Sequence, residues 1–251
     1  MTLYLLGTGA AVSDPHRTTT MLAVSDGAST LAVDCGGDLV QRILAAGLDL
    51  ETLDGLIVTH EHPDHVSGFP LFMEKVWLSG RDRPIPVYGI APALAQARKV
   101  WEAFDTSGWD APEILWREVH HAPGAEVLKT DAWQVTASPV DHAVPTIGLR
   151  FDHASGSSVA YSCDTAPCEH VVELARNADV LVHEATGHQP GVHSSVEEAA
   201  EVAAKAAVHR LLLVHLPPGL TDDDLEPGRK WYTNVALGEE LGVYELRERE
   251  G

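Results

Sequence analysis

The stretch Thr59-His60-Glu61-His62-Pro63-Asp64-His65 directly follows the apolar run 56–58 and places four metal-ligating side chains within six positions. Side chains two positions apart in an extended segment lie on the same side, so His60 and His62 can bind one ion together. Pro63 fixes the turn, after which Asp64 and His65 diverge from the first pair and can serve a second ion. Imidazole and carboxylate ligands together suit Zn²⁺, Mn²⁺ or iron better than Ca²⁺ or Mg²⁺. The motif therefore predicts a metal site.

Four further apolar runs also stop on a histidine or an aspartate. They end on Asp141-His142, on Asp164, on His183-Glu184 and on His215. In an open α/β fold, groups at the ends of such strands meet at one edge of the sheets, where sites form in these folds. We therefore expect these residues to lie near the first motif.

Strands and helices alternate along the chain, which is an α/β pattern. Helical periodicity predicts helices over 38–46, 66–79, 92–104, 168–176 and 195–208. Short apolar or β-branched runs predict strands over 2–6, 20–25, 29–33, 55–59, 85–88, 114–119, 132–140, 146–151, 157–162, 179–182, 210–214 and 242–246. No linker or repeat stands out, so we expect residues 1–251 to form a single domain.

Composition narrows the class of protein. The 251 residues include 17 Lys and Arg against 37 Asp and Glu, for a net charge of −20, with 14 His and 3 Cys. Three cysteines cannot form a disulfide framework. No apolar run approaches the ~20 residues of a membrane span and no basic segment opens the chain, so we expect a cytoplasmic protein. The negative charge would repel the backbone of an extended nucleic acid, although bound cations can reverse the sign of a local site.

These motifs resemble the metallo-β-lactamase superfamily of metal-dependent hydrolases, and within it most closely the ribonuclease Z (tRNase Z) branch. The resemblance covers residues 3 to 216 and also rests on the stretches Leu6-Gly7-Thr8-Gly9-Ala10-Ala11, Asp34-Cys35-Gly36, Ser162-Cys163-Asp164-Thr165, His183-Glu184-Ala185-Thr186 and His193-Ser194-Ser195. It implies a four-layer αββα sandwich with two metal ions, and a homodimer because relatives dimerise. The family pattern implies one ion on His60, His62 and His142, a second on Asp64, His65 and His215, and a bridge between them through Asp164.

The resemblance also implies roles in catalysis. His193 would act on the scissile phosphate. From the chemistry of the ligands, we also expect Asp64 to orient the attacking hydroxide as well as bind metal. By their positions, Asp34, Glu184 and Asp141 are candidates to orient the ligating imidazoles. Two divalent ions can activate water and polarise a phosphoryl oxygen. We therefore expect a binuclear hydrolase, with zinc as the first choice of metal and manganese or iron as alternatives.

One departure from the tRNase Z pattern bears on the substrate. Those enzymes carry a tRNA-binding arm between the third histidine and the bridging aspartate, but His142 and Asp164 are only 22 positions apart here. The missing arm and the negative charge favour a small or cyclic phosphodiester as substrate and disfavour an extended nucleic acid. Three alternatives stay open: hydrolysis of a carboxylic ester, lactone or sulfate ester, 3′ processing of tRNA, and a metal-binding module without turnover.

Overall fold

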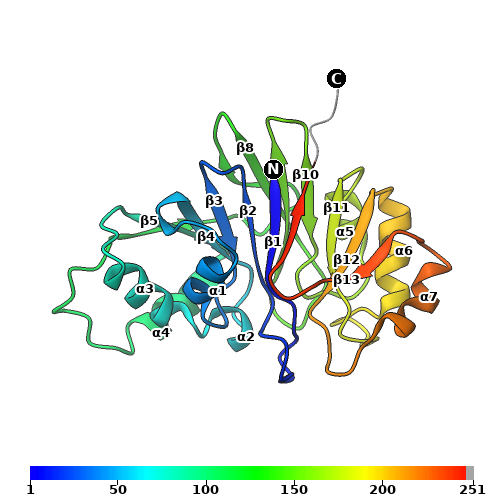
Figure 1. Cartoon of the computed structure of the whole chain (residues 1–251), viewed down its shortest axis with the longest axis horizontal. Helices are drawn as coiled ribbons and strands as arrows, with labels where there is room; N and C mark the ends of the chain where they lie inside the picture. The colour runs from blue at the N-terminus through cyan, green and yellow to red at the C-terminus, as the bar shows by residue number, and fades with distance from the viewer. Residues whose placement is uncertain (247–251) are drawn as a thin grey trace.

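In the computed structural model, which describes residues 1–246, two mixed β-sheets lie face to face and helices cover the outer face of each (Figure 1). The layers run helix, sheet, sheet, helix, so the predicted αββα sandwich is confirmed. Among residues 1–246, none of the helices is long and apolar enough to cross a membrane.

The first sheet contains the N-terminal strands and has the order β14-β1-β2-β3-β4-β5-β6. Strands β3 to β6 run parallel to one another, so their carboxyl ends share one edge. Its strands are β1 (Thr2–Gly7), β2 (Met21–Ser25), β3 (Thr30–Val33), β4 (Leu53–Val58), β5 (Ile85–Gly89), β6 (Ile114–Glu118) and β14 (Gly242–Glu245).

The second sheet has the order β13-β12-β11-β10-β9-β8-β7. Strands β10 to β13 are parallel, and β7 to β10 form an antiparallel meander. Its strands are β7 (Ala125–Lys129), β8 (Trp133–Pro139), β9 (Ile147–His153), β10 (Ser158–Tyr161), β11 (Val180–Glu184), β12 (Arg210–Val214) and β13 (Val235–Leu237).

The helices divide between the two outer faces. The first sheet is covered by α1 (Leu39–Ala45), α3 (Phe69–Leu78) and α4 (Ala91–Trp101), with the single turn α2 (Pro63–Val66) at the sheet edge. The second is covered by α5 (Glu169–Leu174) and α6 (Val196–Ala206), and α7 (Glu226–Arg229) packs on α6. Short 3₁₀ turns occupy Leu50–Thr52 and Asp222–Leu225.

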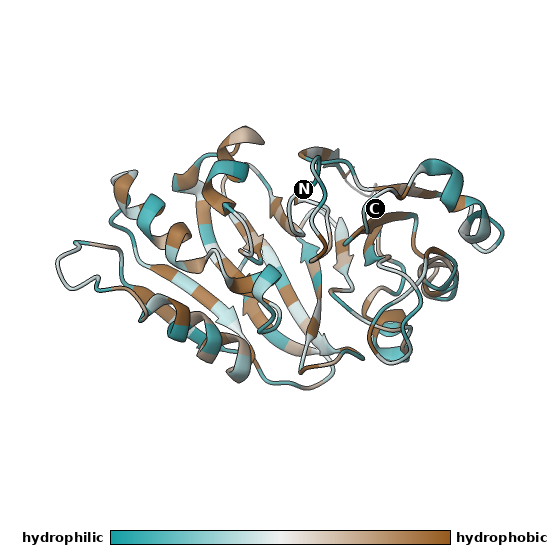
Figure 2. Cartoon of the chain, turned by 90° about the horizontal axis from the view of Figure 1, so that it is seen from below, coloured by the Kyte–Doolittle hydropathy of each residue, from teal (hydrophilic) through white to brown (hydrophobic). Residues whose placement is uncertain are grey.

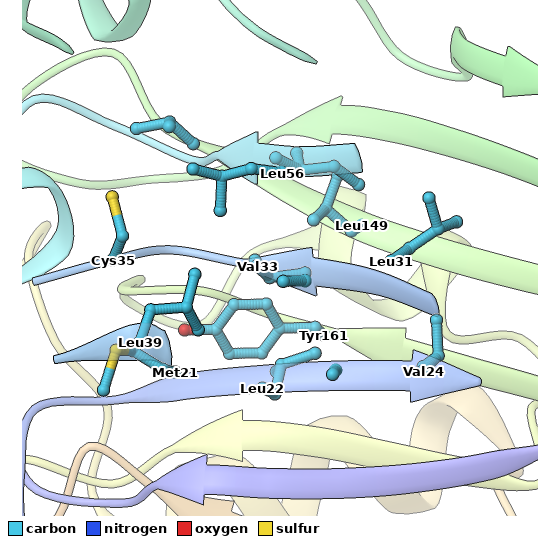
Figure 3. Packing of buried hydrophobic residues seen from close by; sticks show 14 of the residues in the cluster. Met21, Leu22, Val24, Leu31, Val33, Cys35, Leu39, Leu56, Leu149 and Tyr161 are labelled. Atoms are coloured by element: carbon cyan, nitrogen blue, oxygen red, sulfur yellow. The ribbon is translucent and has the colours of Figure 1, made fainter. Parts of the chain in front are cut away.

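Apolar side chains fill the space between the layers. Between the sheets, the fully buried ring of Tyr161 packs among Leu22, Val33 and Leu149 (Figure 3). A second buried cluster, rich in alanine, joins the outer face of the second sheet to α5 and α6. Figure 2 shows the corresponding distribution of hydropathy. Hydrophobic residues run along the strands, whereas hydrophobic and hydrophilic residues alternate along the helices. Rigid packing of this kind holds the strand ends in fixed positions.

We expected one helix over 66–79, but the structure has two helices in this region. The first begins at Pro63, and the second follows a break at Ser67 and Gly68. The Gly68 N–H donates to Cys35 O at 2.8 Å, and a Cβ at Gly68 would lie 2.2 Å from Gly37 O. The chain breaks here because its backbone packs directly on the turn that follows β3.

Besides the two 3₁₀ turns, three short elements were not expected from the sequence. Strand β7 lies at a sheet edge and carries the charged residues Glu126 and Lys129, so its sequence lacks the alternation of apolar and polar residues that predicts a strand. Strand β13 has three residues and α7 has four, too few for a periodic signal. The remaining expected strands and helices are present with shifts of a few residues at their ends.

Candidate metal centre

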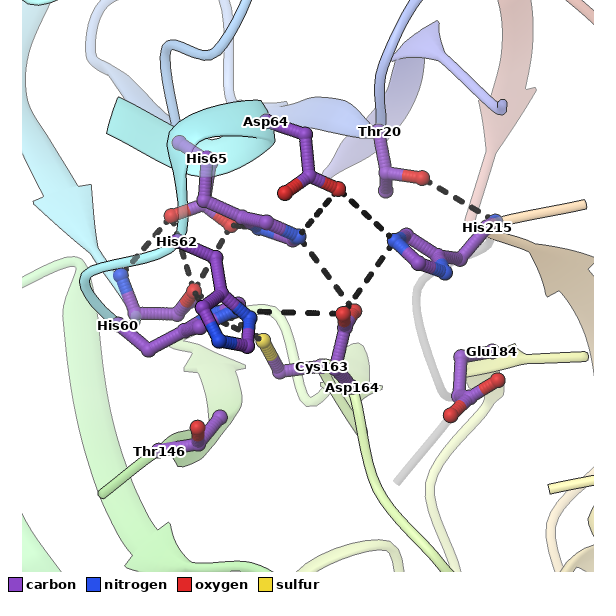
Figure 4. A network of polar contacts seen from close by, with 12 residues as sticks. Thr20, His60, His62, Asp64, His65, Thr146, Cys163, Asp164, Glu184 and His215 are labelled. Carbon is purple, nitrogen blue, oxygen red and sulfur yellow. Dashed lines mark hydrogen bonds and ion pairs between the residues drawn. The ribbon is translucent and has the colours of Figure 1, made fainter. Parts of the chain in front are cut away.

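All seven predicted ligands lie together at one edge of the two sheets. Figure 4 labels six of them, all except His142. His60 and His62 follow β4, and Asp64 and His65 lie in α2. The other three follow strands of the second sheet: His142 after β8, Asp164 after β10 and His215 after β12. The convergence expected from the strand ends is therefore what the structure shows.

The first cluster consists of His60, His62, His142 and Asp164. Its ligating atoms all lie within 4.8 Å of one another. His62 Nδ1 is 3.1 Å from His60 Nε2 and 3.2 Å from His142 Nε2. Nitrogen ligands of a tetrahedral zinc ion at 2.0–2.1 Å are separated by about 3.3 Å, so these spacings suit a single ion.

The second cluster consists of Asp64, His65, Asp164 and His215. His215 Nε2 lies 3.2 Å from Asp64 Oδ2 and 3.3 Å from Asp164 Oδ2. His65 Nε2 lies 3.6 Å from Asp64 Oδ2 and 3.5 Å from Asp164 Oδ1. Asp164 belongs to both clusters, which is the arrangement a bridging carboxylate requires.

Unpartnered polar atoms show that the clusters fit cations. His65 Nε2 and Asp164 Oδ1 are buried, and neither atom has a hydrogen-bond partner among the described residues. Such atoms are costly unless a ligand or ion meets them. In the first cluster, His60 and His142 each use Nδ1 to donate a hydrogen bond away from the cluster. In a neutral ring the other nitrogen, Nε2, then carries a lone pair, and both of these lone pairs point toward His62 Nδ1. One N–H of His62 can satisfy only one of them, whereas a cation satisfies all three nitrogens.

Outer hydrogen bonds orient four of the five imidazoles. His65 Nδ1 donates to Asp34 Oδ2 at 2.8 Å, His142 Nδ1 donates to Val192 O at 2.9 Å, and His215 Nδ1 lies 2.6 Å from Thr186 Oγ1. His60 Nδ1 lies 3.1 Å from Thr59 Oγ1, which itself donates to Asp34. These bonds fix each ring with Nε2 toward its cluster. One carboxylate, Asp34, thus supports a ring in each cluster.

Backbone geometry at the strand ends is unusual. Asp34, Cys163 and His215 have φ values of 61°, 55° and 52°, in the left-handed region that residues other than glycine rarely adopt. Each comes directly after, or within two residues of, a strand that ends at the clusters. Such conformations cost of order 1–3 kcal/mol each and are characteristic of functional sites.

The charges in the clusters shift the pKa values of the metal-free side chains. Burial opposes ionisation of Asp164, but the neighbouring His215 and His65 outweigh it and hold its pKa well below the usual range. Burial likewise opposes a charge on His65, yet Asp164 and Asp34 raise its pKa well above the usual value. Burial and the charge of His65 lower the pKa of His60. Without metal, the second cluster therefore holds a proton that an ion must displace.

His193 lies beside both clusters. Its ring centroid is 5.2 Å from that of His142 and 5.6 Å from that of His215. Its Nδ1 donates to Glu184 Oε1 at 2.7 Å, and the buried Glu184 also accepts from the backbone of Thr165 and Ser194. Burial opposes protonation, but the hydrogen bond and charge of Glu184 outweigh it and raise the pKa of His193.

The segment after His193 is set by a helix cap. Ser195 Oγ accepts from the Glu198 N–H, and Glu198 Oε2 accepts from the Ser195 N–H at 2.8 Å, a capping box that begins α6. Such a cap contributes ~1 kcal/mol and fixes the direction in which the chain enters the helix. Rigid α6 thus anchors the loop that presents His193.

The remaining candidates have different surroundings. Asp34 orients His65 as expected, whereas Glu184 supports His193 and no metal cluster imidazole. The Asp141 side chain is exposed and makes no hydrogen bond or ion pair to these rings within residues 1–246. His183 lies in β11, is buried, and its Nδ1 bonds the Glu184 carbonyl at 2.7 Å.

Thr59 and Thr186 were missed because their contacts with ligand rings arise only in the folded chain.

Comparison with known proteins agrees with this geometry. A family model described as a beta-lactamase superfamily domain matches residues 30–216. The chain belongs to the metallo-β-lactamase superfamily. It is 33% identical over 271 aligned residues to a ribonuclease Z of Mycolicibacterium paratuberculosis, covering 94% of this chain and 95% of that protein. The superfamily membership and this relative place it in the ribonuclease Z-like branch, as a metal-dependent hydrolase.

Solved structures share the fold across nearly the whole chain. Human tRNase Z, short form, superimposes with a TM-score of 0.81 at 21% identity, covering 98% of this chain and 100% of that one. A diphosphatase from the PhnP family superimposes with a TM-score of 0.75 at 21% identity, covering 98% of both chains. Because this superfamily fold binds divalent metal ions, the two clusters are its candidate metal sites in this chain. The ribonuclease Z name of the sequence relatives weakens our expectation that an extended nucleic acid is excluded.

Proposed function

We propose that this hydrolase is a binuclear phosphodiesterase that acts on a small or cyclic phosphodiester. The observation that carries the proposal is His193, held by buried Glu184 beside two clusters that share Asp164. We assign one ion to His60, His62, His142 and Asp164, and a second to Asp64, His65, Asp164 and His215. The mixed imidazole and carboxylate donors favour zinc, with manganese or iron as alternatives.

The bound ions would supply Lewis acid chemistry, polarising a phosphoryl oxygen and activating water. Of the two carboxylates, Asp64 is the more accessible, with 14% of its side chain exposed against 3% for Asp164. Asp64 is therefore placed to accept a hydrogen bond from the attacking water and so to orient it. Burial opposes ionisation of Asp64, but the His215 hydrogen bond and the charges of His65 and His215 together outweigh it and lower the pKa of Asp64, which keeps the carboxylate an acceptor.

His193 would act on the leaving group. Its Nδ1 is occupied by Glu184, which leaves Nε2 as the proton donor for substrate. The raised pKa keeps the ring protonated to higher pH than a free imidazole. An imidazolium there would stabilise negative charge on the phosphoryl group and donate its proton to the departing oxygen.

The test compares two histidines of the same loop. We expect His193→Ala to lower the kcat for bis-p-nitrophenyl phosphate by about 10²-fold or more, as for loss of a donor that stabilises the charge of the transition state. His188→Ala is the control, because His188 is 62% exposed and pairs with Glu198 away from the clusters. Equal rates for wild type and His193→Ala would overturn the phosphodiester proposal. Faster hydrolysis of p-nitrophenyl acetate, a lactone or p-nitrophenyl sulfate would favour the ester alternative, and absence of all turnover would favour a non-catalytic module.

RNA is the second candidate substrate, and it is favoured by the ribonuclease Z name of relatives that match nearly the full chain. Against it, the segment between His142 and Asp164 is taken up by β9, β10 and their short connections. That segment therefore leaves no room for a protruding arm. Cleavage of a precursor tRNA by the purified protein at rates above those for bis-p-nitrophenyl phosphate would make RNA the first choice.

A further inference from the structure

A pocket of about 340 Å³ lies at the opposite end of the sandwich from the metal clusters. On one side it is lined by the beginnings of β3, β4 and β5, and on the other by the end of β7 and the start of β8. In Figure 1 the turn between β7 and β8 lies at the end of the sheets away from α2. Asp54, which lines the pocket, precedes His60 by six residues of extended chain, or about 20 Å at ~3.3 Å per residue. The pocket is therefore separate from the candidate active site.

The charge of the pocket is opposite to that of the protein. The charged residues that line it are Arg81, Arg83, Lys129 and Asp54, so cations outnumber acids here in a chain with 17 basic and 37 acidic residues. Arg83 pairs with Asp54 at 2.7 Å. The charges of Arg81 and Lys129 remain, and neither forms an ion pair within residues 1–246.

Arg81 is the more informative of the two cations, because only 3% of the residue is exposed. Its Nη1 and Nη2 donate to Leu50 O at 2.5 Å and Leu53 O at 2.6 Å, bonds that hold the turn before β4. Arg81 Nε is buried and has no hydrogen-bond partner in the part of the chain that the structure describes. No carboxylate among residues 1–246 forms an ion pair with this guanidinium, and Glu51 and Asp54 act on its charge only from a distance. Because a buried cation without a direct ion pair is costly, the charge favours an anion in the adjoining space.

The rest of the lining is apolar or aromatic. Leu31, Leu128 and the rings of Tyr88 and Trp133 face the pocket from the two sheets. The Tyr88 ring lies against Gly55, where a Cβ would come within 3.0 Å of it, so glycine makes room for the ring. Trp133 Nε1 is buried and has no hydrogen-bond partner among residues 1–246. Apolar walls with a few polar donors are typical of small-molecule sites.

We propose that this pocket binds a small organic anion with a flat apolar body, such as an aromatic carboxylate or sulfonate. The apolar body lies between the Tyr88 and Trp133 sides, and the negative charge faces Arg81 and Lys129. Such a ligand contacts both sheets at once, through β4, which leads to His60, and β8, which leads to His142. It binds without touching either metal cluster.

The probe for this site is 8-anilinonaphthalene-1-sulfonate, an aromatic monoanion whose fluorescence rises in apolar surroundings. We expect saturable binding of one molecule per chain, unchanged after metal removal with EDTA. Lys129→Glu should raise the Kd about tenfold or more, because it reverses a charge at the rim of the pocket. The matched control, Lys99→Glu on α4, makes the same change at an exposed lysine outside the pocket and should leave the Kd within about twofold.

A second comparison separates charge recognition from apolar adsorption. N-phenyl-1-naphthylamine has the same rings without the sulfonate, and we expect it to bind wild type at least about tenfold more weakly. Arg81→Met should weaken sulfonate binding if its circular dichroism and Tm show a folded protein, and Lys129→Glu carries the test if it does not fold. The proposal fails if sulfonate binding is absent, is equally tight in Lys129→Glu and Lys99→Glu, or is matched by the neutral probe.

Discussion

The carboxylate of Asp34 offers the sharpest test of how the metal clusters are built. It is fully buried, accepts from His65 Nδ1 at 2.8 Å and from the Thr59 N–H at 2.8 Å, and also accepts from Thr59 Oγ1. Asp34→Asn keeps the size of the side chain, and asparagine tolerates the φ of 61°. The Thr59 N–H requires an acceptor, so the amide oxygen stays on Thr59 and the amide N–H faces His65 Nδ1, from which it cannot accept a hydrogen bond. The ring would then carry its proton on Nε2, the atom that faces the second cluster.

The expected size of the effect follows from this single hydrogen bond. Loss of an outer partner of a metal-binding imidazole weakens metal affinity by about 10- to 100-fold, or ~1.4–2.7 kcal/mol. The loss should fall mainly on the second ion, because His60 of the first cluster reaches Asp34 only through Thr59. Titration of the metal-free protein with Zn²⁺ against a chromophoric chelator measures both affinities.

Asp141→Asn provides the matched control for this experiment. It is the same chemical change directly before His142, but the Asp141 side chain is exposed and contacts none of the ligand rings among the described residues. We expect its two zinc affinities to equal those of wild type. Unchanged affinities in Asp34→Asn, or an equal loss in both variants, would refute the proposed role of Asp34.

Three further predictions follow from other contacts. His193→Gln should keep the wild-type metal content while losing about 10²-fold or more in kcat, since the ring contacts substrate and not metal in our proposal; a fall in metal content would contradict this. Zn²⁺ binding at pH 7 should release at least one proton from His65, because the pKa of this ring is raised in the metal-free protein. Calorimetry in buffers of different ionisation enthalpy counts the released protons, and a count of zero would contradict this prediction. The raised pKa also means that the metal-free protein loses stability as the pH rises through the pKa of His65 in the folded state. Gly36→Ala should destabilise the protein by ~1–3 kcal/mol in urea unfolding, because its Cβ would lie 1.7 Å from Asp64 O, whereas Gly108→Ala meets nothing within 4 Å and should be near neutral.

Much of the candidate site could be predicted because its signals are local. The motif at 60–65 is contiguous, and the other ligands directly follow apolar runs that are recognisable as buried strands. Parallel strands then bring their ends to one edge. The same reasoning correctly placed Asp34 next to a ligating ring, since it also follows a strand.

Contacts made between distant segments could not be predicted in this way. The bond from His142 to Val192 O joins residues 50 positions apart, and the bond between Thr186 and His215 joins residues 29 apart. The break before α3 depends on how closely Gly68 packs on the turn after β3. The pocket around Arg81 likewise exists only because the two sheets meet, and its residues carry no motif.

The metal content of three proteins tests the central claim most directly. After metal-replete expression, elemental analysis should find two ions per chain in the wild type and one in each of His142→Ala and His215→Ala. Each variant removes a ligand that belongs to only one cluster. Retained folding, checked by circular dichroism, makes the counts comparable. Fewer than one ion in the wild type, or two ions in both variants, would contradict the binuclear centre.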